Sequence, residues 1–143
     1  MKKIIFVIAL MFSSVMATEI NWAKSYKDAE AKAKVEKKPI IIVFTTETCR
    51  WCRKLESTTL KDEDVVKMMN EKFIALHLDR DNDDYPAGLE VRGVPMTYFL
   101  NDNADAILGA RSGYVEGNRY VTWMKLAIQQ AELYKKSIQN KEK

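Results

Sequence analysis

The sequence predicts a single α/β domain with a central mixed β-sheet flanked by helices on both faces. Three observations carry this prediction. Short, uninterrupted apolar runs are typical of buried strands, and amphipathic segments between them are typical of helices. A Cys-x-x-Cys pair, Cys49 and Cys52, stands shortly after the first strand-like run. The order strand, helix, strand, crossover, hairpin and terminal helix describes most of the chain and produces such a sheet.

The N-terminal segment has the features of a signal peptide. Lys2 and Lys3 precede an almost wholly apolar run over residues 4–15. Val15 and Ala17 are the small residues at the positions that signal peptidase recognises. A membrane anchor is the alternative, but the run is shorter than the roughly 20 residues that a spanning helix needs. We therefore expect a signal peptide over residues 1–17, cleavage after Ala17 and a mature domain over residues 18–143.

Basic and acidic groups are nearly balanced in the expected mature domain. The chain has 23 Lys and Arg against 20 Asp and Glu, and the signal peptide contains two of the Lys and none of the acids. Nucleic-acid binding relies on an excess of positive charge, so we expect no nucleic-acid partner. The length suits one compact domain, which we expect to be a monomer.

The first half of the domain is predicted to contain helix, strand, helix, helix and strand. Residues 22–37 are rich in Ala, Lys and Glu at helical spacings, and a proline ends this helix. The apolar run 40–44 predicts a central strand buried on both faces. A second helix is expected to begin at Cys49 and a third near Asp62. Residues 73–78 form the next expected strand.

The second half is predicted to be a hairpin followed by a long helix. A short helix or turn is expected over residues 87–90. Residues 96–100 form one expected strand and residues 106–108 its partner, with a bend over residues 109–113. Apolar residues at helical spacing over residues 120–133 predict the terminal helix.

The pair Cys49 and Cys52 is interpreted as reactive rather than architectural. A disulfide between residues three apart closes a very short loop, and exported domains built on disulfides use more than the two cysteines of this chain. At a helix start, unpaired N–H groups and the nearby Arg50, Arg53 and Lys54 should favour the Cys49 thiolate. Cys52, one turn deeper, should stay protonated and act as the resolving thiol.

Two metal-binding alternatives use the same cysteines. A structural zinc site needs four ligands, and beyond the pair the sequence offers only one histidine, His77, within an apolar run, so no resident metal is expected. His77 is interpreted as a surface or hydrogen-bonded core residue rather than a catalytic base. A Cu(I)-binding module stays open, because this soft ion accepts two sulfur ligands.

Four features stand together between Pro39 and about Gln130: the apolar strand leading into Cys49-Arg50-Trp51-Cys52, Leu78-Asp79, Val91-Arg92-Gly93-Val94-Pro95, and Gly113 before the last helix. On these residues the chain resembles thioredoxin-like proteins. The resemblance implies a thioredoxin-like fold, protein thiol and disulfide substrates, and no cofactor beyond the Cys49–Cys52 disulfide. It also implies that Pro95 is cis and lies beside this disulfide, and that the Val94 backbone pairs with a bound substrate chain.

Within this class the stretch around the cysteines is similar to exported thioredoxin-like proteins and to the C-terminal domain of the membrane electron transporter DsbD. Glu56 matches an acidic residue near the active site of that domain, although a solvated helix carboxylate fits the sequence equally well. Val43 stands where many members bury an aspartate, so Glu56 or water would have to accept the proton. Thr48 replaces a usual tryptophan, and Trp51 is either a docking surface or a residue packed against a loop.

The resemblance implies a periplasmic thiol:disulfide oxidoreductase, preferably a reductase or electron relay with a membrane electron donor of the DsbD type. The expected mature domain has no room for the dimerisation domain of isomerases or the helical insertion of the strong oxidase. An oxidase or isomerase stays open, because cations near the thiolate make a disulfide more oxidising. In the expected site Cys49 and Cys52 exchange disulfides. Trp51, Val94 and Pro95 face the substrate, and Arg50 and Glu56 adjust the acidity of the thiols.

Overall fold

The computed structural model describes residues 18–143, and the expected signal peptide lies outside the described residues. One mixed sheet has the order β2-β1-β3-β4, built from β1 (Ile40–Thr45), β2 (Ile74–Asp79), β3 (Met96–Leu100) and β4 (Ile107–Ser112). β1 is parallel to β2 and antiparallel to β3, and β3 is antiparallel to β4. This mixed pairing confirms the predicted type of sheet.

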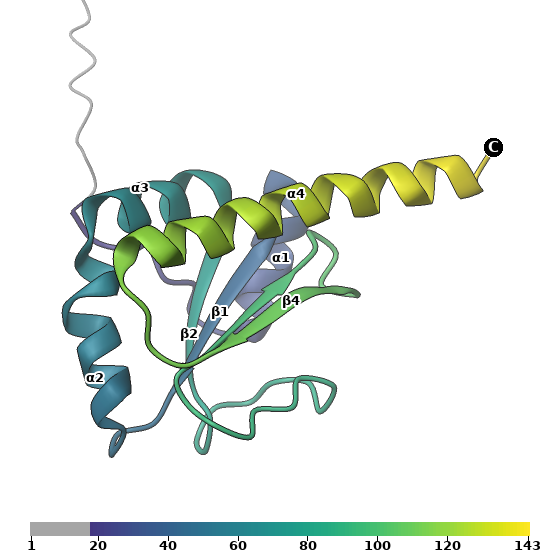
Figure 1. Ribbon diagram of the computed structural model, residues 1–143. Coiled ribbons are helices and arrows are strands. Elements are labelled where there is room, and N and C mark those ends of the chain that lie inside the picture. Colours follow the sequence, from purple (N-terminus) through teal and green to yellow (C-terminus); the bar gives the residue numbers. More distant parts are fainter. Residues whose placement is uncertain (1–17) are drawn as a thin grey trace, which may run out of the picture.

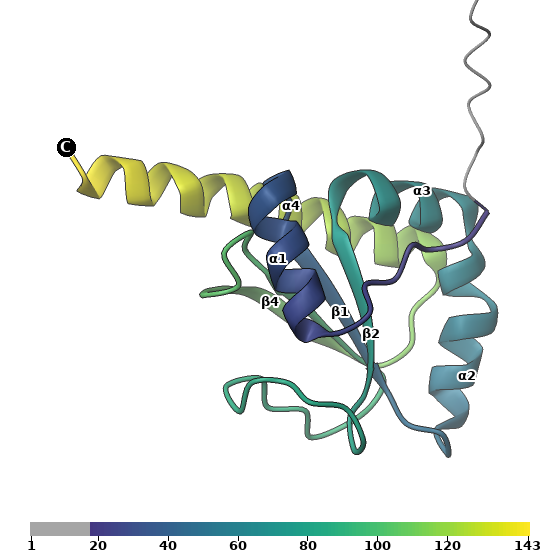
Figure 2. The same ribbon diagram turned by 180° about the vertical axis from the view of Figure 1, so that it is seen from behind.

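Helices cover both faces of the sheet, which confirms the predicted fold class. One face carries α1 (Tyr26–Glu36), and the other carries α2 (Arg50–Ser57), the short 3₁₀ helix η1 (Thr59–Lys61), α3 (Glu63–Lys72) and α4 (Gly117–Lys141). Figure 1 shows α2, α3 and α4 around one side of the sheet. Figure 2 shows α1 in front of the opposite face. Within residues 18–143 no helix is long and apolar enough to cross a membrane.

The apolar run of β1 is buried on both faces of the sheet, as predicted. Ile41 and Val43 belong to the core beneath α2, α3 and α4, whereas Ile40, Ile42 and Phe44 belong to the core beneath α1. All five side chains are 0% exposed. At about 1.5–3 kcal/mol for each apolar side chain of this size, their burial is a main source of stability for the sheet that carries the site.

The first helix starts later than the sequence predicted. Ser25 caps α1 by accepting a hydrogen bond from the Asp28 backbone N–H at 3.1 Å, while the Asp28 carboxylate accepts one from the Lys24 N–H at 2.8 Å. These two hydrogen bonds fix the start of the helix. Trp22, predicted inside the helix, instead forms a parallel bridge to Ala75 of β2. The helical spacing between Trp22 and Tyr26 therefore does not reflect a shared helix.

The last strand is longer than the sequence predicted. The expected bend over residues 109–113 is wrong up to Ser112, because β4 continues to that residue and pairs it with Met96. The chain turns at Gly113, where a φ of 92° favours a residue without a Cβ. Most of β4 is exposed or half-exposed at the sheet edge, so it lacks the apolar run that marks the inner strands.

Tyr120 attaches α4 to the sheet. Its side chain is fully buried, and its hydroxyl lies 3.0 Å from the Thr97 hydroxyl of β3. Burial raises the pKa of Tyr120, so its hydroxyl stays protonated. Tyr120→Phe is expected to lower the free energy of unfolding by about 1–2 kcal/mol, because the buried Thr97 hydroxyl loses its partner. Denaturant unfolding should show a lower midpoint at an unchanged slope.

Tyr134→Phe is the matched control for this stability change. Tyr134 lies on the same helix but is only half-buried. Its replacement is expected to leave the unfolding midpoint nearly unchanged. Equal losses in the two variants would show that the contact between Tyr120 and Thr97 contributes nothing specific.

Candidate active site

Cys49 lies between β1 and α2, directly before the first residue of α2. The start of this helix lies at the lower left in Figure 1. Cys49 is the N-cap residue of α2, and its Sγ accepts a hydrogen bond from the Cys52 backbone N–H at 3.1 Å. The two cysteines form a disulfide. Once this bond is reduced, the N–H donor and the helix dipole both favour negative charge on Cys49. The geometry therefore favours a thiolate at this position.

The two sulfur-bearing residues differ in their access to solvent. Cys52 is 1% exposed, whereas Cys49 is partly exposed. A large substrate can therefore approach the Cys49 side of the pair and not the Cys52 side. Disulfide exchange needs this asymmetry, because one thiol attacks the substrate and the other resolves the mixed disulfide.

The loop before β3 lies against the disulfide. The Val94–Pro95 peptide bond is cis, and the Val94 carbonyl oxygen lies 3.6 Å from Cys49 Sγ. Pro95 is buried, and its carbonyl accepts a hydrogen bond from the Gly113 N–H at 2.9 Å, which ties this loop to the end of β4. The structure thus brings the predicted residues Val94 and Pro95 together with Cys49.

Trp51 has one packed face and one exposed face. Its ring stacks on Tyr114 with the centroids 5.8 Å apart and the planes inclined by 30°. Lys54 Nζ lies 5.3 Å from the centroid of Trp51 and 4.7 Å from that of Tyr114. Even so, 48% of Trp51 is exposed. Trp51 therefore packs against the loop that follows β4 and still presents aromatic surface between the two cysteines.

Glu56 of α2 and His77 of β2 form a partly exposed polar cluster. His77 Nε2 lies 3.2 Å from Glu56 Oε1 and 2.8 Å from Thr45 Oγ1. Val43 of β1 is the register partner of His77 in the sheet. Glu56 follows Cys52 by one helical turn, so the two side chains share a face of α2. A histidine of β2 therefore contacts the carboxylate that follows Cys52 by one turn of α2.

The cations beside the cysteines interact with groups other than the sulfurs. Arg53 Nη1 donates to the Glu47 carbonyl at 2.9 Å, and the Arg50 guanidinium carbon lies 5.5 Å from the Trp51 centroid. Lys54 lies over the same aromatic pair. An effect of Arg50 on the thiolate stays a prediction. Among residues 18–143 no group of three or more His, Cys, Asp or Glu side chains is placed to hold a metal ion.

Two residues near the disulfide were not assigned to the site from the sequence. Tyr114 stacks on Trp51, and its only sequence signal was an aromatic residue directly after Gly113 and before the last helix. His77 is half-buried and hydrogen-bonded, in line with its interpretation, but its pairing with Glu56 had no sequence signal. That contact depends on the packing of α2 beside β2.

The fold and the cysteine geometry together define a class. A disulfide at the start of α2, with a proline loop beside it on a four-stranded mixed sheet, places the chain in the thioredoxin-like class. The particular family follows from the sequence match. Residues 9–142 match the family model Thioredox_DsbH, described as "Protein of unknown function, DUF255". The chain belongs to this family.

Two curated relatives match parts of the chain. The chain is 34% identical over 62 residues to Spermatogenesis-associated protein 20 of Mus musculus, which covers 43% of this chain. It is 30% identical over 109 residues to Uncharacterized protein B0495.5 of Caenorhabditis elegans, which covers 70% of this chain. The matches span only 8% and 15% of those proteins. The likeness therefore concerns a small part of much longer chains.

Solved structures share the fold. A structure titled "DsbH Oxidoreductase" superposes with a TM-score of 0.69 at 22% identity, covering 81% of this chain and 89% of that one. The C-terminal domain of DsbD from Neisseria meningitidis superposes with a TM-score of 0.53 at 20% identity, covering 69% of this chain and 90% of that one. These likenesses confirm the thioredoxin-like fold and the predicted similarity to the DsbD domain.

Proposed function

We propose that this protein is an exported, periplasmic thiol:disulfide oxidoreductase that acts as a reductase or electron relay for protein substrates. The observation that carries the proposal is the asymmetry of the cysteine pair. Cys49 is partly exposed with an N–H donor on its sulfur, whereas Cys52 is buried beside it. This arrangement supports exchange with a large disulfide-bearing partner from one side only.

In the reductase direction, the Cys49 thiolate attacks one sulfur of a substrate disulfide. A mixed disulfide forms, and the other substrate sulfur leaves as a thiolate. Cys52 then loses its proton and attacks Cys49 Sγ, which forms the Cys49–Cys52 disulfide and releases the second substrate thiolate. Two electrons pass to the substrate, and a dithiol donor must then reduce the pair again.

The neighbouring groups support each step. The Val94 carbonyl beside Cys49 and the exposed face of Trp51 support binding of an extended substrate chain next to the attacking sulfur. Glu56, held by His77, supports removal of the Cys52 proton, directly or through a water molecule.

The surroundings of Cys49 support a reduction potential between that of thioredoxin and that of a strong disulfide oxidase. The N–H donor and the helix dipole stabilise its thiolate, but Arg53 interacts with a carbonyl group and Lys54 with aromatic rings. A strongly oxidising pair needs much greater stabilisation of the reduced form. We therefore expect a potential between about −270 and −180 mV, the range from thioredoxin to disulfide isomerase.

Equilibration of the purified protein with glutathione buffers, followed by alkylation of free thiols, measures this potential. A value near about −120 mV would overturn the reductase proposal in favour of an oxidase. Alkylation in intact cells tests the direction separately, and a largely oxidised pair there contradicts a reductase. Purified protein that carries copper and exchanges no disulfide would support the Cu(I)-binding alternative.

The cellular location and the electron donor are parts of the same proposal. The predicted signal peptide supports export, and the fold shared with the DsbD domain supports a membrane electron donor of that type. N-terminal sequencing of protein from the periplasmic fraction is expected to begin at Thr18. An uncleaved chain in the cytoplasmic fraction would contradict the location.

A further inference from the structure

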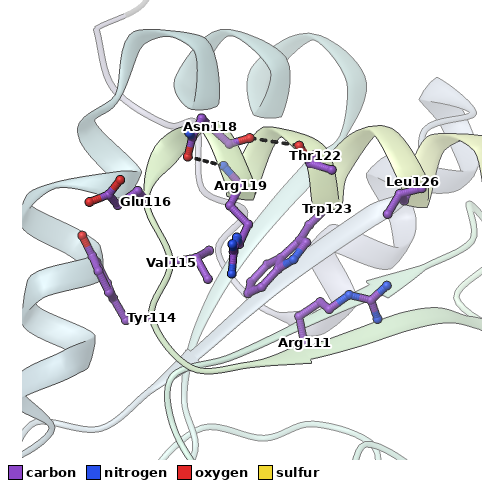
Figure 3. Close-up of a pocket in the computed structure, with 9 residues that line it drawn as sticks. All are labelled: Arg111, Tyr114, Val115, Glu116, Asn118, Arg119, Thr122, Trp123 and Leu126. Carbon is purple, nitrogen blue, oxygen red and sulfur yellow. Dashed lines mark hydrogen bonds between the residues drawn. The ribbon is translucent and has the colours of Figure 1, made fainter.

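A groove of about 880 Å³ lies between α4 and β4. Figure 3 shows Arg119 and Trp123 pointing from α4 toward β4, with Arg111 of β4 reaching in from the other wall. We call this feature, defined by Arg111, Arg119 and Trp123, the arginine groove. It combines two cationic side chains with an aromatic ring between them.

Both guanidinium groups lack a carboxylate partner within residues 18–143, where no ion pair includes Arg111 or Arg119. Arg111 Nη1 donates to the adjacent Ala110 carbonyl at 2.9 Å. Glu116 also lines the groove, but its carboxylate points away from both guanidinium groups in Figure 3. A planar guanidinium fits the two oxygens of a carboxylate, so the arginine groove suits an acidic ligand.

Tyr114 connects the arginine groove with the candidate active site. It lines one end of the groove and stacks on Trp51, which stands between the two cysteines. A polypeptide whose cysteine is joined to Cys49 can therefore pass over the Trp51–Tyr114 pair and continue into the groove.

We propose that the arginine groove binds an acidic segment of the protein that exchanges its disulfide with Cys49, an inference that rests on the proposed function. Carboxylates of the segment pair with Arg111 and Arg119, and its apolar atoms pack against Trp123. Charge complementarity selects this occupant, because a basic or purely apolar segment leaves both guanidinium groups without a partner. Exposed charges of this kind act mainly on the rate of association.

Exchange with two matched peptides tests the inference. Each peptide carries one cysteine in a mixed disulfide with 2-mercaptoethanol, flanked on both sides by extended segments with either Glu or Gln at the same positions. At low ionic strength the reduced protein is expected to reduce the Glu peptide about fivefold faster than the Gln peptide. The difference should shrink as salt is added, because salt screens exposed charges.

The variant with both Arg111→Glu and Arg119→Glu is expected to lose this preference and to favour the Gln peptide. The control variant carries both Lys72→Glu and Lys125→Glu. It has the same change in charge, but both positions lie outside the arginine groove, so it should keep the preference for the Glu peptide. Equal rates for the two peptides with the unmodified protein, or an unchanged preference in the arginine variant, overturn the inference. Failure to reduce either peptide would instead contradict the proposed function.

Discussion

Cys52→Ser is expected to convert the protein into a covalent trap for its substrates. The Cys49 thiolate can still form the mixed disulfide, but a hydroxyl at the buried position does not displace the substrate sulfur. Turnover with a protein disulfide should fall at least about a hundredfold, since resolution then depends on an external thiol. Non-reducing gel electrophoresis of cell extracts should show adducts that disappear on reduction, and mass spectrometry should locate the bond at Cys49.

Cys49→Ser makes the same chemical change at the partly exposed position. It is expected to abolish turnover without forming adducts, because buried Cys52 is out of reach of a large substrate. Adducts of similar abundance in both variants would contradict the assigned roles. Cys52→Ala should trap substrates like Cys52→Ser while avoiding the cost of burying a hydroxyl, about 1–3 kcal/mol where it finds no partner.

Glu56→Gln is expected to slow the release of substrate from the mixed disulfide at least about tenfold. The reason is that Cys52 must lose its proton before it attacks, and the Glu56 carboxylate lies one turn away on the same helix face, held by His77. Rapid mixing of reduced protein with a disulfide peptide, followed by acid quenching and mass analysis, separates formation of the mixed disulfide from its decay. Only the decay should slow.

Glu47→Gln is the matched control for this step. It removes the same charge from an exposed residue of the loop before α2, whose backbone carbonyl rather than its carboxylate is the group that binds Arg53. Both steps are expected to keep their rates in this variant. If Glu56→Gln slows formation and decay of the mixed disulfide to the same extent, its carboxylate is not the acceptor of the Cys52 proton.

In the proposed mechanism, substrate selection and proton transfer take place on different sides of the disulfide. Trp51 contacts Tyr114, which leads to the arginine groove beside β4. Glu56 contacts His77 on β2, and β2 and β4 are the opposite edges of the sheet. The charge-reversed arginine variant and Glu56→Gln should therefore affect different steps, association in the first case and resolution in the second.

The buried strands could be predicted from the sequence, whereas the exposed edge strand could not. The expected runs 40–44 and 96–100 match β1 and β3 closely, because burial on both faces leaves an unbroken apolar signal. β4 was predicted too short, since its exposed residues carry no such signal. The start of α1 was misplaced because helical spacing continued past the Ser25 cap.

By itself the sequence determined the position of the pair Cys49 and Cys52, at the start of a helix after a buried strand, and the fold class. These follow from spacing and burial along a short stretch of chain. Only the tertiary structure decided that Tyr114 stacks on Trp51, that His77 holds Glu56, and that two arginines line one groove. Such contacts join residues far apart in sequence, and they depend on strand register and helix packing, which no local pattern records.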